Sequence, residues 1–338
     1  MKKFIGLDLG TSIFKAVAFT PKGDKFMLTH AYVLPYPANS ILDGTILDFG
    51  EVSQQISKII ESGNFNKAPI AVAIKGAMVA AKSVKVPYIS KEQLKNDMLF
   101  IAEQYMRADP EEYAIDYKLV KTDTENSIAQ IAFAAIRKEN LADYISIIES
   151  AQQEVGAIDV ESLALSDLYT RMKLPKNGIS MILHIGHTVT QAIFIKDGNY
   201  SHSESCYMAG EHCTNLLTAA LQLNSEEVES AKTSPELHPQ GDAAKKVIEE
   251  RFIPDFIKNI DKVVNNHTLA GGLPIDRIYL SGGSATLHGL NSALEAKFEV
   301  PIILMNPTAL IDVTNNIAKQ VLELKPAALN VAIAMALR

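Results

Sequence analysis

The same succession of strands and turns occurs twice in this chain, once near residue 4 and once near residue 181. The strands are expected at Phe4–Leu9, Ile13–Phe19 and Lys25–Val33 in the first copy, and at Ile179–Ile185, Val189–Ile195 and Tyr200–Met208 in the second. A glycine-containing turn joins the first two strands of each copy, and Asp197-Gly198 forms a favoured hairpin turn in the second. Because helices follow both copies, the sequence predicts two α/β halves with approximate internal symmetry, whose glycine turns face one another.

The first glycine turn combines a carboxylate with a hairpin suited to phosphate. Asp8 ends an apolar run, and Gly10 lets the chain reverse tightly. Thr11 and Ser12 then offer hydroxyl and amide donors. Backbone N–H groups that converge in such a turn bind anions, and a neighbouring carboxylate can hold a hydrated magnesium ion. The residues alone leave a second interpretation open, an ordinary hairpin whose Asp and Thr side chains satisfy the turn amides.

Composition excludes several classes of protein. The 338 residues predict roughly two domains of about 150 residues, and 47% hydrophobic with 21% charged residues is typical of a soluble globular chain. A net charge of −7 argues against nucleic acid as the main partner. Cys206 and Cys213 form no CxxC pair, so neither a disulfide framework nor a cysteine-rich zinc module is expected.

The N-terminus and the hydropathy predict a cytoplasmic protein. Met1-Lys2-Lys3 leads directly into Phe4–Asp8, and this early acidic residue leaves no core for a signal peptide. No run reaches the ~20 apolar residues that span a bilayer. We therefore expect membrane attachment only through a partner.

The chain is expected to have two domains and an insertion. The first domain comprises residues 1–77 and 137–175, the insertion 78–136, and the second domain 176–338, with a helical part at 210–272. In the insertion, Ser90 and Gln93 resemble a capping box that opens a helix over Lys91–Met106. Two strands, Ala114–Lys121 and Ser127–Ile136, follow it.

The remaining elements follow from apolar spacing and from turn residues. Apolar residues from Leu141 to Val155 recur at spacings of three and four and predict a helix that Gly156 ends, before a strand at Ala157–Val160. Further helices are expected at Glu51–Ser62, Ser162–Lys173, Glu211–Leu221, Ser225–Lys232, Asp242–His267, Leu287–Phe298 and Pro326–Arg338, and further strands at Ile70–Ile74, Ile275–Leu280 and Val300–Leu304.

The sequence has two phosphate-type hairpins, followed by a strand that leads into Ser281-Gly282-Gly283-Ser284. This order of elements is specific, although each element alone is a weak signal. In this order the chain resembles the actin-like ATPase superfamily, with its ribonuclease H-like fold, and within it the PilM family beside FtsA. The segments that carry the resemblance are Gly6–Val17 for the opening phosphate loop, Ala102–Tyr105 and Ile115–Tyr117 for the inserted 1C subdomain, Phe133–Lys138 and Asp159–Glu161 for the connecting strand and helix, and Ile275–Leu290 for the adenosine motif.

The resemblance implies a site for ATP and Mg²⁺. The residues implied to contact the nucleotide are Asp8, Gly10, Thr11, Ser12 and Lys15 in the first loop, Gly186, His187 and Thr188 in the second, and Gly210, Glu211, Glu229, Lys232, Gly282, Gly283 and Ser284 around the sugar and base. Asp8 would hold the magnesium ion through water.

One departure from the family pattern counts against hydrolysis. The second phosphate loop normally carries an Asp where this chain has His184. Since a neutral imidazole cannot match a carboxylate's charge beside Mg²⁺, we expect ATP binding with weak or absent turnover. Asp8 and Glu161 are the candidate catalytic residues. Glu161 either orients an attacking water or is simply a carboxylate favoured at a helix start.

Two other features, a group of histidines and cysteines and the apolar terminal helix, are interpreted as structural and not as a metal site or a membrane anchor. The neighbouring residues His184, His187, His202, Cys206, His212 and Cys213 fit no structural zinc spacing. The terminal helix of small apolar residues, 327–337, has no basic face, so we expect it to pack in the core and not on a membrane.

By its resemblance to the PilM family, the chain is expected to act as a cytoplasmic ATP-binding adaptor of type IV pilus assembly, at the inner membrane. It would dock the N-terminal tail of PilN in a groove involving residues from about 70 to 136, and would reach PilO, PilP and the motor platform indirectly. Homo-oligomerisation stays open. The alternatives are an FtsA-like filament-forming division protein, a small-molecule kinase of the same superfamily, and the cytoplasmic part of a type II secretion platform protein.

Overall fold

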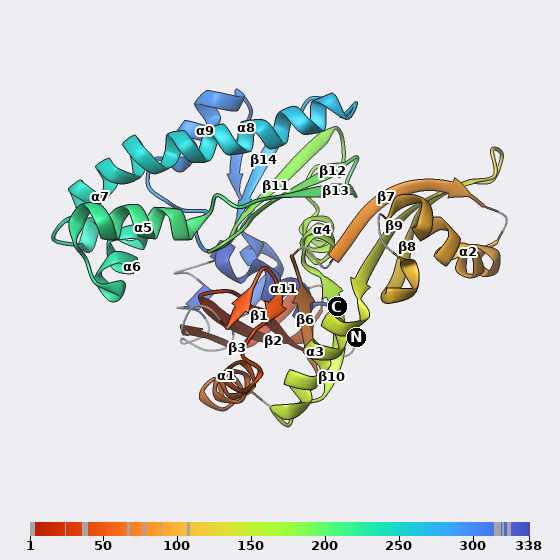
Figure 1. Cartoon of the computed structure of the whole chain (residues 1–338), viewed down its shortest axis with the longest axis horizontal. Helices are drawn as coiled ribbons and strands as arrows, with labels where there is room; N and C mark the ends of the chain where they lie inside the picture. The colour runs from red at the N-terminus through yellow and green to blue at the C-terminus, as the bar shows by residue number, and fades with distance from the viewer. Residues whose placement is uncertain are drawn as a thin grey trace.

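Most strands form two large sheets that stack with helices between and around them, and a smaller unit projects from one side (Figure 1). The computed structural model describes residues 4–23, 25–35, 40–65, 68–76, 79–88, 90–106, 109–313, 319, 321–322 and 326–338. Among these residues, no helix is both long and apolar enough to cross a membrane.

The first sheet is built from the N-terminal copy of the repeated strands. Its order is β10-β6-β1-β2-β3-β16. The strands are β1 (Ile5–Leu9), β2 (Ile13–Lys22), β3 (Lys25–Pro35), β6 (Ile70–Ile74), β10 (Val155–Val160) and β16 (Ile311–Val313), and β4 (Ile41–Leu42) pairs separately with β5 (Thr45–Ile46). The antiparallel β1–β2 hairpin sets Asp8 opposite Lys15.

The second sheet contains the second copy and also the strands of the insertion. Its order is β15-β14-β11-β12-β13-β7-β9-β8. The strands are β7 (Val79–Pro87), β8 (Tyr113–Asp123), β9 (Ile128–Arg137), β11 (Ile179–Ile185), β12 (Thr190–Lys196), β13 (Asn199–Cys206), β14 (Arg277–Ser281) and β15 (Ile302–Leu304). The pairing of His202 on β13 with Lys82 on β7 joins the insertion to the second half.

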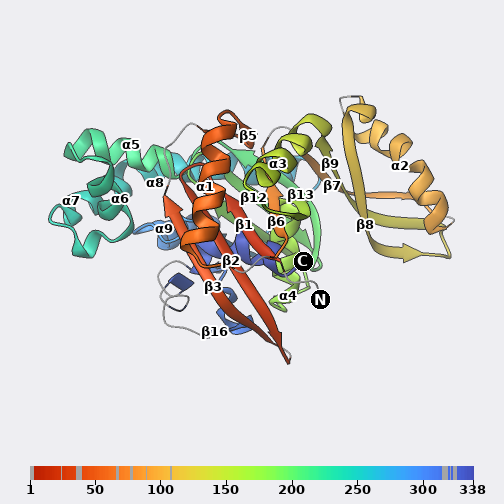
Figure 2. The same ribbon diagram turned by 90° about the horizontal axis from the view of Figure 1, so that it is seen from below.

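Helices occupy three positions relative to these sheets. α1 (Phe49–Ser62) and α3 (Lys138–Ser150) cover the outer face of the first sheet (Figure 2). α4 (Glu161–Arg171) and the buried α11 (Asn330–Ala336) lie between the two sheets, where one apolar cluster contains residues of both halves. α5 (Gly210–Leu221), α6 (Ser225–Thr233), α7 (Gly241–Val247), α8 (Ile253–Leu269) and α9 (Leu290–Phe298) belong to the second half.

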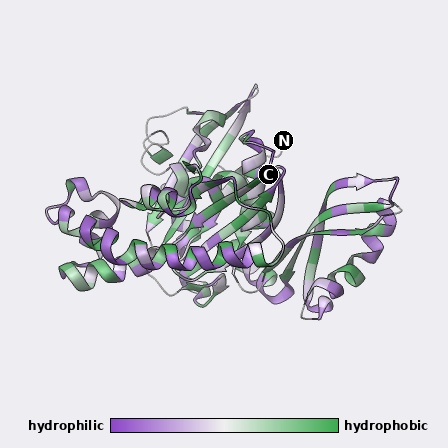
Figure 3. Ribbon diagram, turned by 90° about the horizontal axis from the view of Figure 1, so that it is seen from above, coloured by the Kyte–Doolittle hydropathy of each residue, from purple (hydrophilic) through white to green (hydrophobic). Residues whose placement is uncertain are grey.

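The burial of each helix follows its apolar spacing. On α8, the buried residues Ile253, Phe256, Ile260 and Val263 are three or four positions apart, while the other side of the helix is polar (Figure 3). In the insertion, α2 (Lys91–Tyr105) begins at Ser90, whose hydroxyl accepts the Gln93 amide at 3.1 Å. The helix then packs on one face of β7, β8 and β9.

Most predicted elements are present, and the differences have identifiable causes. The predicted helix over 141–155 ends at Ser150, and Gln152 takes a left-handed φ of 57°. Val155 and Gly156 instead begin β10. A side chain at Gly156 would meet the Phe4 ring at 2.6 Å, so this glycine permits close packing and does not end a helix. The predicted helix over 242–267 contains a π-helical turn at Ile248–Phe252.

The C-terminal segment returns to the first sheet, although the predicted second domain includes it. β16 pairs with β3, with Ile311 opposite Phe26. α11 packs on β1 and α4, and all of its residues are buried. The expectation that the terminal helix packs in the core is therefore confirmed.

Candidate functional site

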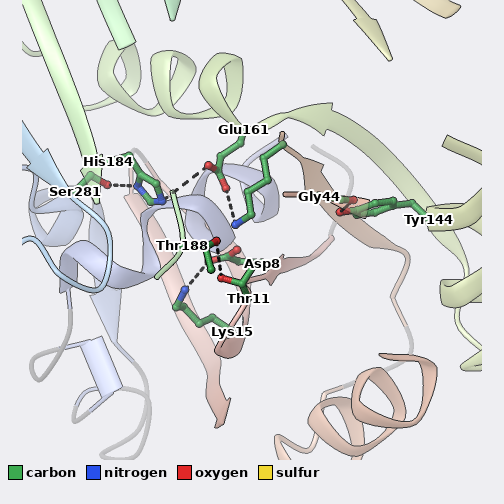
Figure 4. A network of polar contacts seen from close by, with 10 residues as sticks. Asp8, Thr11, Lys15, Gly44, Tyr144, Glu161, His184, Thr188 and Ser281 are labelled. Atoms are coloured by element: carbon green, nitrogen blue, oxygen red, sulfur yellow. Dashed lines mark hydrogen bonds and ion pairs between the residues drawn. The ribbon is translucent and has the colours of Figure 1, made fainter. Parts of the chain in front are cut away.

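The glycine turns of the two halves meet across one pocket. The Thr11 hydroxyl in the β1–β2 turn lies 3.1 Å from the Thr188 hydroxyl in the β11–β12 turn (Figure 4). The strand registers place Asp8 opposite Lys15 and His184 opposite Gln191. The two repeated hairpins therefore face each other, as the internal duplication predicted.

Both turns require glycine because the backbone folds back on itself. A Cβ on Gly10 would lie 2.5 Å from the Ile13 carbonyl oxygen, and one on Gly186 would lie 2.7 Å from that of Val189. The Gly186 amide donates to the same Val189 oxygen at 3.0 Å. These turns expose backbone to the pocket at the places where a phosphate could approach.

The first turn carries a buried ion pair. The Lys15 ammonium donates to Asp8 Oδ2 at 2.7 Å, and the Asp8 side chain is 4% exposed. Burial by itself would raise the pKa of Asp8, but the charges of Lys15 and Lys75 outweigh burial and hold this pKa below its usual value. Asp8 is therefore a carboxylate at neutral pH.

A second ion pair of the pocket joins the end of β6 to the start of α4. Lys75 Nζ, just after β6, is 3.3 Å from Glu161 Oε2. Glu161 is the first residue of α4, where the helix dipole favours a negative charge. Burial would lower the pKa of Lys75, but its attraction to Glu161 and Asp8 is stronger and raises this pKa. Lys75 therefore carries a positive charge at neutral pH.

His184 connects this ion pair to the second half. Its Nε2 is 4.0 Å from Glu161 Oε1, and its Nδ1 is 3.0 Å from the Ser281 hydroxyl on β14 (Figure 4). Asn330 of α11 donates to the same hydroxyl at 3.0 Å. Burial lowers the pKa of His184 more than the charge of Glu161 raises it, so the imidazole is neutral.

Most of the residues predicted for the site line one pocket. They are Asp8, Gly10, Thr11, Ser12, Lys15, Glu161, Gly186, His187, Thr188, Glu229, Lys232, Gly283 and Ser284. At its rim, Lys232 Nζ contacts Glu229 at 2.6 Å and donates to the Thr214 hydroxyl at 2.9 Å.

Three predicted residues lie behind the pocket lining. The amides of Gly210 and Glu211 donate to the carbonyl oxygens of Gly186 and His187, at 3.1 and 2.7 Å. Gly282, with a φ of 95°, donates to the Ala327 carbonyl at 3.0 Å. Gly210 and Glu211 therefore support the second turn, and none of the three residues lines the pocket.

Sequence reasoning missed several pocket residues. They are Val33, Asp43, Lys75, Gly76, Val189, Gln191, Ala328 and Leu329, besides Ile13 in the first turn. Lys75 and Gly76 had a detectable pattern, because they directly follow the buried strand β6, and polar residues at that end of a strand often form sites. Asp43 and Leu329 had none, since only the fold brings them near the turns.

The histidines and cysteines that lie near one another in the sequence are dispersed in the structure. His184 and His187 line the pocket, whereas His202 stacks on Phe194 and His267 at ring distances of 4.5 and 5.2 Å. Cys213 is buried, and burial raises the pKa of its thiol to about 12.

Known proteins share this fold and this sequence pattern. The sequence matches the family described as type IV pilus assembly protein PilM over residues 6–338. A chain of the solved "PilM-PilN type IV pilus biogenesis complex" has a TM-score of 0.85 at 20% identity, with 99% of this chain and 98% of that chain covered.

More distant structures have the same architecture. The ethanolamine utilization protein EutJ from Carboxydothermus hydrogenoformans has a TM-score of 0.58 at 16% identity, covering 100% of this chain and 90% of that one. MreB5 of Spiroplasma citri, bound to ADP, has a TM-score of 0.53 at 12% identity, covering 100% and 96%. The predicted actin-like fold is thus confirmed, and because the family match spans nearly the whole sequence, this chain belongs to the PilM family of type IV pilus assembly proteins.

Proposed function

We propose that this chain is a cytoplasmic ATP-binding adaptor that docks the N-terminal tail of PilN at the inner membrane during type IV pilus assembly. PilN would connect it to PilO, PilP and the motor platform, and so to twitching motility. The observation that carries this proposal is a groove between the insertion and the core, in a chain whose fold matches the PilM of a PilM–PilN complex.

The pocket between the two turns supports nucleotide binding. It lies between the two halves, and its lining includes residues of both turns. Glycine turns at Gly10 and Gly186 approach from opposite halves, and Lys15 supplies positive charge. The MreB5 neighbours were solved with ADP and with AMPPNP, so an adenine nucleotide suits this architecture.

The charges in the pocket favour holding a nucleotide over hydrolysing it. Phosphoryl transfer requires strong stabilisation of charge on the transferred group. Glu161, proposed to orient water, is paired with Lys75, and His184 is neutral where a second carboxylate is expected. We therefore propose that any turnover is slow and depends on Asp8 and Glu161.

The donors in the pocket do not fit the magnesium site predicted at Asp8. Magnesium is usually held by one or two carboxylates together with substrate phosphates. Here Lys15 already pairs with Asp8 at 2.7 Å, and Lys75 pairs with Glu161 at 3.3 Å. Nothing in the proposed function depends on the metal.

The proposed PilN groove lies on the face of the inserted sheet opposite α2. Alternation along the strands turns Ile131 and Phe133 toward α2 and Ala132 and Ala134 toward the groove. β8 and β9 form one wall, and α4 with the β12–β13 turn forms the other. The groove has a volume of about 360 Å³ and is open to solvent, as an extended peptide segment would require.

The groove is crossed by ion pairs that a peptide would meet. Lys118 on β8 lies 2.6 Å from Asp167 on α4, and Arg338 contacts both Asp159 and Asp167. Each partner of the Lys118–Asp167 pair comes from a different wall. A peptide that displaced this ion pair would therefore change the distance between the insertion and the core.

The proposed domain division keeps 78–136 as the inserted subdomain and 1–77 with 137–175 as the core of the first domain. Because β16 and α11 contact the first sheet, we propose that residues 311–338 belong with that core. The second domain would then comprise 176–310.

Blocking the groove tests the adaptor function. Thr170 is exposed on α4, lines the groove and donates to the carbonyl oxygen four residues earlier. Thr170→Arg is expected to weaken binding of a synthetic peptide with the PilN N-terminal sequence by about tenfold or more, because the long side chain fills the groove. Calorimetric titration measures this change.

A matched control separates blocking from helix destabilisation. Thr218 on α5 is also exposed, makes the same bond to the fourth preceding carbonyl, and lies outside the groove. Thr218→Arg should bind the peptide like the wild type. Failure of the wild-type chain to bind it, or unchanged binding by Thr170→Arg, would contradict docking in this groove.

A further inference from the structure

We infer that Lys75, together with Lys15, supplies the positive charge that neutralises the nucleotide's phosphates, so that this chain binds ATP without a divalent cation. This inference rests on the proposed nucleotide-binding function and adds the chemistry by which the pocket would recognise its ligand.

The backbone of Lys75 is held in a fixed position. Gly44 and Gly76 have φ values of 82° and 95°, and a Cβ on either would overlap the backbone of the other segment. The Tyr144 hydroxyl donates to the Gly44 carbonyl at 3.0 Å, from a buried position on α3 (Figure 4). The turn at 43–44 therefore clamps residues 75–76 and fixes the origin of the lysine side chain.

The side chain of Lys75 brings a permanent charge to the pocket. Its ammonium is 3.3 Å from Glu161 Oε2, the side chain is 20% exposed, and the residue lines the pocket of the two turns. An ammonium has three N–H donors, so pairing with one carboxylate leaves capacity for a phosphate oxygen. Charge-assisted bonds of this kind are among the strongest that a protein makes to phosphate.

The other charged groups of the pocket leave little negative charge for a metal. Asp8 is paired with Lys15, and at the rim Glu229 is paired with Lys232. Asp43 Oδ2 accepts the Tyr207 hydroxyl at 3.1 Å. A divalent cation would have to approach the ammonium groups of Lys15 and Lys75, whereas a polyphosphate is attracted to both of them.

The test is calorimetric titration of the full chain with ATP, in excess EDTA and in excess Mg²⁺. The wild type is expected to bind with affinities that differ by less than about threefold between the two buffers. The Lys75→Gln/Glu161→Gln double variant removes both partners, so no buried charge is left unpaired. In EDTA it should bind at least about tenfold more weakly, the loss expected for one charge-assisted bond.

Two further variants assign this loss to Lys75. Glu161→Gln alone keeps the lysine, so in EDTA it should bind ATP at least about tenfold more tightly than the double variant does. Lys82→Gln, on β7 and outside this pocket, should also match the wild type. Thermal unfolding in the absence of ATP verifies that each variant is folded.

Three outcomes would overturn the inference. A wild-type affinity that falls tenfold or more in EDTA, on the order of 1.4 kcal/mol, would show that the metal is needed. An undiminished affinity of the double variant in EDTA would show that Lys75 does not contact the phosphates. Absence of ATP binding in both buffers would contradict the proposed nucleotide-binding function as well, which distinguishes the two failures.

Discussion

The chemistry of the pocket is set by a few buried side chains whose partners fix their charge. Asp8 stays ionised because Lys15 and Lys75 outweigh the cost of burying it. His184 is neutral because burial outweighs the attraction of Glu161. A carboxylate on β1 and an imidazole on β11, the corresponding first strands of the two repeated hairpins, therefore differ in charge.

At the scale of single residues, we expect acid to destabilise the folded chain through protonation of His202. Burial, with charge interactions from His267 and Lys82, lowers the pKa of His202 to about 4. The unfolded chain takes up this proton near pH 6.5, so the contribution of His202 to stability is present above about pH 6.5 and is lost as the pH falls toward 4.

Urea unfolding at about pH 7 and about pH 5 measures this effect. His202→Gln should lose less free energy of unfolding between the two pH values than the wild type. If both lose the same amount, His202 does not account for the acid sensitivity.

Among the elements, the contact between β1 and α11 most directly links the chain's two ends. Gly6 on β1 touches the backbone of α11, where an added Cβ would overlap Ala332 and Ala336. The helix consists of small and medium-sized residues, and this composition permits close approach to the strand. The strand that leads to the first phosphate-type turn is thus supported by the last helix of the chain.

We expect Gly6→Ala to lower the free energy of unfolding by about 3 kcal/mol or more, because backbone atoms cannot move aside as a flexible side chain can. Gly283→Ala is the control, since an added Cβ there meets nothing within 4 Å. Urea denaturation followed by circular dichroism measures both variants. A change below about 0.5 kcal/mol for Gly6→Ala would mean that α11 can shift without cost.

For the whole molecule, the proposed nucleotide pocket and the proposed PilN groove share structural elements. α4 contributes Glu161 to the pocket and Asp167 to the groove. β13 brings Tyr200 of the second half to the groove, and the Tyr200 hydroxyl donates to the Ala81 carbonyl of β7 at 3.0 Å. A change in the closure of the two halves would therefore move one wall of the groove relative to the other.

We expect ATP to change the affinity for the PilN peptide by about fivefold or more, and the peptide to change the affinity for ATP by the same factor. Calorimetry of nucleotide-free and ATP-loaded protein measures both. The Thr11→Val/Thr188→Val variant, which loses the hydroxyl contact between the turns, should show a smaller difference. Equal peptide affinities in the two states would remove the coupling and leave the adaptor function in place.

The elements differ in how far the sequence predicted them. Turn glycines and strand alternation identified both repeated hairpins, and Ser90 identified the start of α2. β7 was missed because its pattern contains small and charged residues, and only its neighbours β9 and β13 make it a strand of the sheet. The end of α3 was misplaced because Gly156 serves packing against Phe4, which is distant in sequence.

The sequence by itself determined the local features: the two glycine turns and the strands on either side of them. These depend on dihedral preferences and on alternation between neighbouring residues, which a sequence displays directly. Only the tertiary structure decided that Lys75 pairs with Glu161, that His184 bonds Ser281, and that α11 returns to β1. Those contacts join residues far apart in the chain, and their geometry exists only once sheet order and helix packing have brought the segments together.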